Sequence, residues 1–93
     1  MTDVDMKATP RLLPGVRVRA LDDGARVLLV PEGVVSLTAT GAAIVESIDG
    51  RRDVAGIVAL MHERFDAAGA DVEGDVVDLL GMLAQRTWIE LVR

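Results

Sequence analysis

The sequence predicts one small α+β domain of the winged helix-turn-helix kind, with a three-stranded antiparallel sheet followed by a three-helix bundle. Three observations favour this class. Apolar and polar residues alternate early in the chain, the apolar period becomes helical after Leu37, and 93 residues leave room for one modest core. The domain is expected over residues 10–93. Residues 1–9 show no periodicity and are expected to form a flexible tail or linker.

Strand signals occupy the first part of this domain. Alternation predicts a first strand over residues 16–20, and the Asp-Asp-Gly turn at 22–24 leads into a second strand over 26–30. A Pro-Glu-Gly turn at 31–33 then precedes a short third strand over 34–37. This order makes the third strand the outer strand of a meander.

Helix signals follow the third strand. Thr38 or Thr40 can cap a first helix that ends near Gly50. Asp53 is expected to cap a second helix, whose apolar stripe runs through residues 54–65.

A third helix is expected over residues 71–86. Its inner stripe is apolar, and its first half is acidic, which suits the positive end of the helix dipole. Residues 88–92 are then expected as a short apolar tail that packs back onto the domain.

Composition limits the possible partners. The net charge is −5, which disfavours a nucleic-acid backbone as a partner. No apolar run is long enough for a membrane span. The chain has no cysteine, so disulfides and thiolate sites are excluded, and the cytoplasm is the expected compartment.

Candidate catalytic groups are few. His62 is the only histidine, and no Ser or Cys is spaced to use it as a general base. We expect it on the surface near a helix end. The carboxylates of residues 71–78 are most simply explained by the helix dipole, and no glycine-rich phosphate loop is present. The sequence therefore predicts no enzyme activity, no metal and no cofactor.

The turn and cap residues, taken in order, resemble the PqqD family of pyrroloquinoline quinone biosynthesis over residues 10–92. The most specific pieces are the segments 31–33 and 49–51 at their mutual spacing. Two positions depart from the pattern: Thr38 is often Asn in the family, and Thr87 stands where Gly is common. The remaining matching positions are Pro10, Arg11, Leu12, Pro14, Gly15, Val16, Arg17, Leu29, Leu37, Ile44, Ile57, Asp75, Leu79 and Leu80.

The resemblance implies a peptide-recognition domain without a cofactor. Members of the family bind the leader segment of a ribosomally made precursor peptide and present it to a radical S-adenosylmethionine cross-linking enzyme. They bind the leader as an added strand beside the third strand, in the cleft between that strand and the third helix. An exposed strand edge is physically suited to such pairing.

The candidate peptide-binding residues lie on these two elements. Residues 35 and 37 share one face of the strand and residues 34 and 36 the other, and either pair could line the cleft. The complete candidate set is Val34, Val35, Ser36, Leu37, Asp75, Val76, Asp78, Leu79, Met82 and Leu83.

Two other function classes compete with peptide binding. A winged-helix DNA-binding regulator would need a basic recognition helix, whereas the third helix gains its first positive charge only at Arg86. A structural dimerisation module is possible because exposed edge strands can exchange between chains. A monomer or weak dimer is expected.

Overall fold

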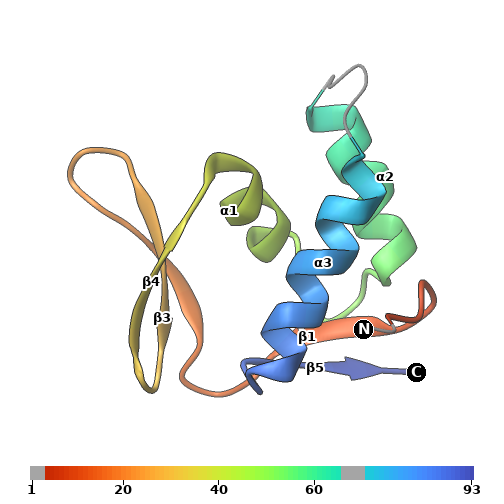
Figure 1. Ribbon diagram of the computed structural model, residues 1–93, viewed down its shortest axis with the longest axis horizontal. Coiled ribbons are helices and arrows are strands. Elements are labelled where there is room, and N and C mark those ends of the chain that lie inside the picture. The colour runs from red at the N-terminus through yellow and green to blue at the C-terminus, as the bar shows by residue number, and fades with distance from the viewer. Residues whose placement is uncertain (1–3, 66–70) are drawn as a thin grey trace.

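The computed structural model describes residues 4–65 and 71–93, which form two small antiparallel sheets and three helices (Figure 1). The α+β class is therefore confirmed. In chain order the elements are β1 (Thr9–Leu12), β2 (Arg17–Ala20), β3 (Arg26–Val30), β4 (Gly33–Leu37), α1 (Ala39–Glu46), α2 (Val54–Arg64), α3 (Val72–Gln85) and β5 (Ile89–Val92).

The three-stranded sheet has the order β2-β3-β4, as the meander predicted. Val18, Leu28 and Val35 are paired across the three strands and form one row on the face that packs on the core. The second strand has the predicted bounds, and the third begins one residue earlier, at Gly33.

A second sheet, which the sequence analysis did not predict, joins the two ends of the domain. β1 pairs antiparallel with β5, and Pro10 lies opposite Leu91. The expected order of three strands followed by three helices is thus incomplete. The apolar segment after α3 does pack back, but it does so as a strand.

The described part of the expected tail, residues 4–9, is also packed. Ala8 is buried, its carbonyl accepts a hydrogen bond from the Val54 N–H at 2.9 Å, and the Met6 carbonyl accepts one from the Ala55 N–H at 2.9 Å. These bonds fix the segment to the start of α2, so the prediction of a flexible tail is wrong for these residues. Residues 1–3 lie outside the described residues.

Each helix begins at a side-chain cap, and in each case a glycine supplies the capped N–H. Thr38 Oγ1 accepts from the Gly41 N–H at 2.9 Å, which decides between the two threonines considered for α1. Asp53 accepts from Gly56 at 2.8 Å, and Asp71 accepts from Gly74 at 2.9 Å. The Asp53 cap was predicted from sequence, whereas Asp71 was expected only as the start of the third helix.

The first helix ends before Gly50, at Ser47. The Ser47 hydroxyl donates to the Ala43 carbonyl at 2.7 Å, and the Arg52 guanidinium donates to the Ser47 carbonyl at 3.2 Å. Gly50 instead adopts a φ of +78° in the following turn. The predicted helix was too long because a glycine in this conformation can serve a loop as well as a helix end.

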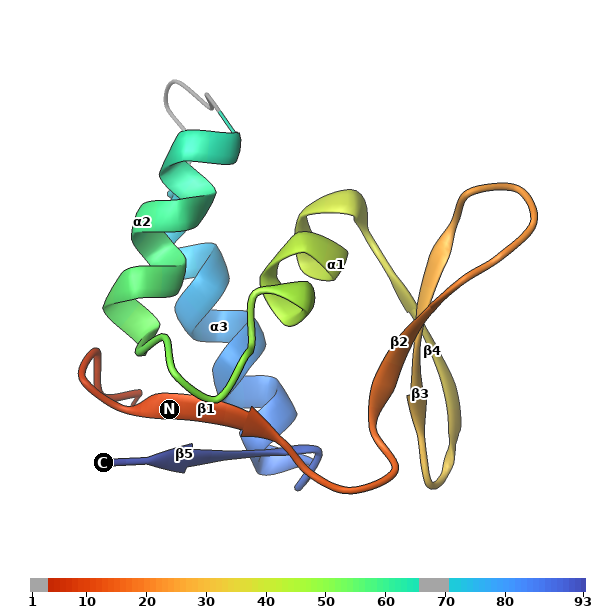
Figure 2. The same cartoon turned by 180° about the vertical axis from the view of Figure 1, so that it is seen from behind.

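The core is continuous from the inner face of the three-stranded sheet, which α1 contacts, to the pair α2 and α3. In both views α1 stands between that sheet and the pair α2 and α3 (Figures 1 and 2). None of the described helices is long and apolar enough to cross a membrane. The largest fully buried side chains are Leu28, Ile44, Ile57, Met61, Leu80, Leu83, Val45, Val54, Val76 and Pro10.

Candidate functional site

The outer edge of β4 is not paired with any strand among the described residues. The β3–β4 hairpin closes on the pair Val30 and Gly33. Hydrogen-bonded and non-hydrogen-bonded pairs alternate from such a closing pair, so Val34 and Ser36 fall at non-hydrogen-bonded positions. Their backbone N–H and C=O groups are therefore directed toward the open edge, where an extended peptide can pair with them.

The two faces of β4 differ in burial. Val35 and Leu37 are half-buried and pack against the core, whereas Ser36 is exposed and Val34 keeps 64% of its surface exposed. Of the two alternatives left by the sequence, the pair at 35 and 37 thus faces the helices. Val34 and Ser36 face away from them.

A shallow depression of about 360 Å³ lies between α1 with its cap Thr38, which directly follows β4, and α3. Gly41 forms its floor: a Cβ atom placed there would lie 3.9 Å from a methyl carbon of Leu37 and 3.9 Å from one of Leu79. A side chain at residue 41 would therefore contact the Leu37 and Leu79 methyl groups on either side. We call the depression the Gly41 groove, and its lining is Thr38, Thr40, Gly41, Ile44, Asp75 and Leu79.

The structure divides the predicted helical residues into two groups. Asp75 and Leu79 line the groove, Asp78 is exposed, and Met82 is half-buried against the core. Val76 and Leu83 are core residues with 0% and 1% of their surface exposed.

Direct peptide contact predicted for Val76 and Leu83 is therefore wrong for this conformation, because neither side chain offers accessible surface. The helical period placed them near the correct face. It could not separate the buried part of that face from its exposed flank.

Four groove residues were not predicted from sequence, and all of them belong to α1 or its cap: Thr38, Thr40, Gly41 and Ile44. The available signal was a glycine three residues after a cap threonine, in the first turn of a helix. Glycine is a poor helix former, so its presence there indicates a close approach of neighbouring groups.

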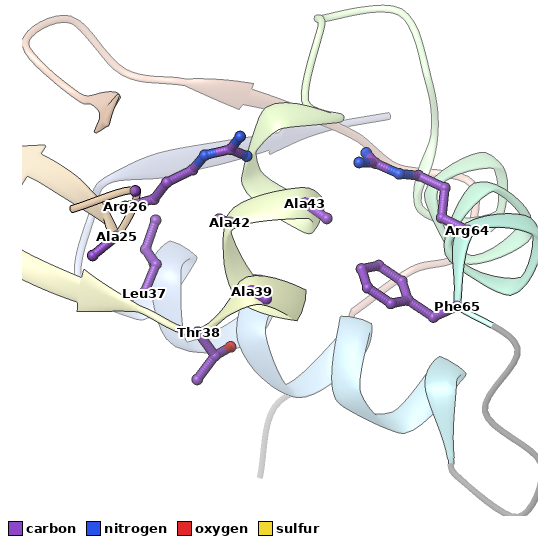
Figure 3. A pocket seen from close by; sticks show the side chains of 10 residues that line it. Ala25, Arg26, Leu37, Thr38, Ala39, Ala42, Ala43, Arg64 and Phe65 are labelled. Carbon is purple, nitrogen blue, oxygen red and sulfur yellow. The ribbon is translucent and has the colours of Figure 1, made fainter. Parts of the chain in front are cut away.

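A second depression, of about 430 Å³, lies over the opposite face of α1. Figure 3 shows Arg26 and Arg64 on either side of the small side chains of α1, with the Phe65 ring directed toward them. Arg26 is already paired with Glu46. Only Leu37 of the predicted contact residues lines this depression.

The described residues hold no cluster of three or more His, Cys, Asp or Glu side chains suited to a metal ion. His62 lies exposed in the last turn of α2, which confirms the position expected for it. The site therefore consists of a strand edge and an apolar groove with a carboxylate at one end, an arrangement suited to binding an extended chain.

Comparisons with known proteins find similarity over most of the chain. Residues 25–89 match the family model described as coenzyme PQQ synthesis protein D (PqqD). A protein named PqqA binding protein from Klebsiella pneumoniae strain 342 is 51% identical over 65 residues, which cover 70% of each chain. One of the same name from Azotobacter vinelandii is 38% identical over 92 residues, covering 98% of this chain and 99% of the relative.

A solved structure is similar over nearly the whole chain. It is the solution NMR structure of the PqqD truncation of Methylobacterium extorquens PqqCD, described as a functional and stand-alone recognition element for ribosomally synthesised and post-translationally modified peptides. The TM-score is 0.79, with 33% identity and 96% of each chain covered. By sequence and by structure, the chain belongs to the PqqD family.

Proposed function

We propose that this chain is a peptide chaperone that binds the precursor peptide of pyrroloquinoline quinone and presents it to a radical S-adenosylmethionine cross-linking enzyme. Relatives named for binding PqqA support the first part. The compartment we propose is the cytoplasm, because a ribosomally made peptide is first available there. The chain acts as a binding module, without a cofactor of its own.

The open edge of β4 beside the Gly41 groove is the observation that carries this proposal. A peptide strand would pair with the outward groups of Val34 and Ser36. Its side chains on the helix-facing side would reach the apolar surface between Leu37 and Leu79. The carboxylate of Asp75 at the end of the groove favours a basic peptide residue nearby.

A peptide strand paired with the short edge of β4 would bind with an affinity suited to its delivery to an enzyme. About four backbone hydrogen bonds at ~1 kcal/mol net each, together with a few apolar side chains, correspond to a dissociation constant on the order of micromolar. A peptide held with this affinity can be released to an enzyme, and the carrier can act as a monomer or weak dimer.

The DNA-binding alternative keeps one point in its favour, since the three strands and three helices can be compared with the wing and helices of a winged helix-turn-helix-like domain. The first turn of α3, however, carries Glu73 and Asp75, and its last turn has no basic residue. An acidic helix is repelled by phosphates. We therefore favour peptide binding.

Ser36 provides the test of strand addition. Ser36→Pro deletes an N–H directed at the open edge and leaves the β3–β4 ladder intact, because proline is tolerated at such edge positions. We expect precursor-peptide binding to weaken about tenfold in calorimetry, the loss of roughly one backbone bond. Ser36→Ala, which keeps the N–H, is the matched control. Equal affinities for the two variants would contradict strand addition.

A further inference from the structure

The three-stranded sheet has a second face, which points away from the helices. On this outer face Arg17, Leu29 and Val34 are paired across the strands and form one row. A second row contains Arg19, Val27 and Ser36. Figures 1 and 2 show α1 on one side of the sheet and no other described element on the other.

The outer face combines apolar surface with positive charge. Val34 is 64% exposed and Leu29 is half-buried, although neither packs against the core. Arg17 and Arg19 are exposed and form no ion pair with any of the described residues. An exposed apolar patch beside unpaired charges is typical of a surface that another protein covers.

The charge on this sheet contrasts with that of the whole chain. The three strands contain three arginines and no acidic residue, while the chain has a net charge of −5. One of these, Arg26, is paired with Glu46 on α1. The two remaining arginines place positive charge on the outer face, while Asp22 and Asp23 lie near Arg19 in the turn after β2. Positive charge on this face attracts an acidic surface.

A second copy of this chain fits the outer face poorly. In a symmetric dimer the same patch meets itself, so Arg17 and Arg19 of one copy would approach those of the other. No carboxylate of the three strands is available to offset this repulsion. The occupant with complementary chemistry is a different protein, one that presents carboxylates around an apolar side chain.

The position of this face on β4 suits the enzyme that modifies the bound peptide. Val34 and Ser36 present side chains to the outer face, while their backbone groups and the opposite face of the strand serve the proposed peptide site. Peptide and partner can therefore be bound at the same time, which a carrier requires when it hands over its peptide.

We infer that the outer face, formed by Arg17, Arg19, Leu29 and Val34, docks an acidic surface of the enzyme that modifies the bound peptide. This inference rests on the proposed function. It adds to that function the surface that binds the enzyme and the charge complementarity that holds the two proteins together.

The test is a titration of the purified radical S-adenosylmethionine enzyme of the pathway with the full chain, at physiological salt. Arg17→Glu/Arg19→Glu should weaken enzyme binding at least tenfold, because both attractive charges become repulsive. Lys7→Glu/Arg51→Glu is the control, since it makes the same change in net charge at exposed positions outside this sheet. It should bind the enzyme within about twofold of the unchanged chain.

Precursor peptide is titrated separately into the same three chains, which are the unchanged chain and the two charge variants. The inference requires unchanged peptide affinity in Arg17→Glu/Arg19→Glu. Equal loss of enzyme binding in both charge variants, or none in either, would overturn it. Loss of peptide binding in the outer-face variant alone would assign these residues to the peptide site instead.

A dimer of the unchanged chain that the outer-face variant dissociates in sedimentation would assign the face to self-association and also overturn the inference. Failure of the proposed function looks different, because the unchanged chain would then not bind precursor peptide at all.

Discussion

The indole Nε1 of Trp88 donates hydrogen bonds to both carboxylate oxygens of Glu32, at 3.3 and 3.2 Å, across 56 positions of the sequence. Glu32 lies in the turn between β3 and β4, and Trp88 lies between α3 and β5. The Arg86 guanidinium stands 5.7 Å from the centroid of the Trp88 ring. The contact joins the β3–β4 hairpin to the end of α3, the two elements that flank the proposed peptide site.

Removal of this contact should lower stability. We expect Glu32→Ala to reduce the free energy of unfolding by about 1 kcal/mol, since one charge-assisted bond is lost at a partly exposed position. Urea unfolding followed by the fluorescence of Trp88 measures the change. Glu32→Gln should recover part of the loss because its amide oxygen still accepts. Glu63→Ala, at an exposed position on α2, is the control, and an equal effect there would count against the contact.

Gly41 and Gly56 form a matched pair for testing the groove. Both occupy the third position of a helix. A Cβ atom on Gly41 would lie 3.1 Å from the Thr38 cap oxygen, and one on Gly56 would lie 3.2 Å from the Asp53 cap oxygen. We expect alanine at either position to change the free energy of unfolding by less than about 1 kcal/mol, because the gain in helix propensity offsets the tight contact.

Peptide binding should separate the two glycine variants. Only Gly41→Ala places a methyl group between Leu37 and Leu79, so only this variant should weaken binding in calorimetry, by several-fold. Weakening by Gly56→Ala to the same degree would mean that the groove is not the site.

Thr87 adopts a φ of 63°, the left-handed conformation, which is unfavourable for a β-branched residue. Glycine adopts this conformation without the steric cost that a β-branched side chain brings. Thr87→Gly should therefore raise the free energy of unfolding by about 1 kcal/mol in urea denaturation. Ala59→Gly on α2, where no such strain exists, should lower it by a similar amount. A loss of stability in Thr87→Gly would contradict the assignment of strain.

Asp49 organises the turn between α1 and α2. Its carboxylate accepts from the backbone N–H groups of Arg52 at 2.8 Å and Arg51 at 2.9 Å, and these bonds lower the pKa of Asp49 below that of an ordinary aspartate. Because the folded-state pKa is depressed, the stabilisation is present at neutral pH and is lost as the pH falls through that value.

An NMR titration of the Asp49 side chain measures this directly, and its midpoint should lie below the usual aspartate range. The stability difference between the unchanged chain and Asp49→Asn should shrink over the same acidic interval. A midpoint in the usual range would contradict the role given to these bonds.

Local sequence signals predicted much of the three-stranded sheet and the starts of the helices. The strand at 26–30 and the cap at Asp53 are confirmed because alternation and capping depend on residues close together in the chain. The β1–β5 pair could not be found in this way, since Thr9 pairs with Val92 and Pro10 resembles a strand breaker. Pro10 is tolerated in a two-stranded sheet, where every strand has an open edge.

The candidate site was predicted only in part for a similar reason. The edge at 34–37 follows from strand order, which the turn residues determine. The Gly41 groove depends on Leu37 and Leu79 converging on one glycine from separate elements, and the glycine signal indicates a close approach without identifying these two leucines. Burial of Val76 and Leu83 likewise depends on which flank of α3 the rest of the core covers.

Amide chemical-shift mapping of the labelled chain during titration with precursor peptide tests the central claim most directly. Strand addition predicts the largest changes at residues 34–37, with further changes at Gly41 and along the Asp75 and Leu79 flank of α3. Changes confined to β1, β5 and α2, with residues 34–37 and Gly41 unaffected, would contradict it.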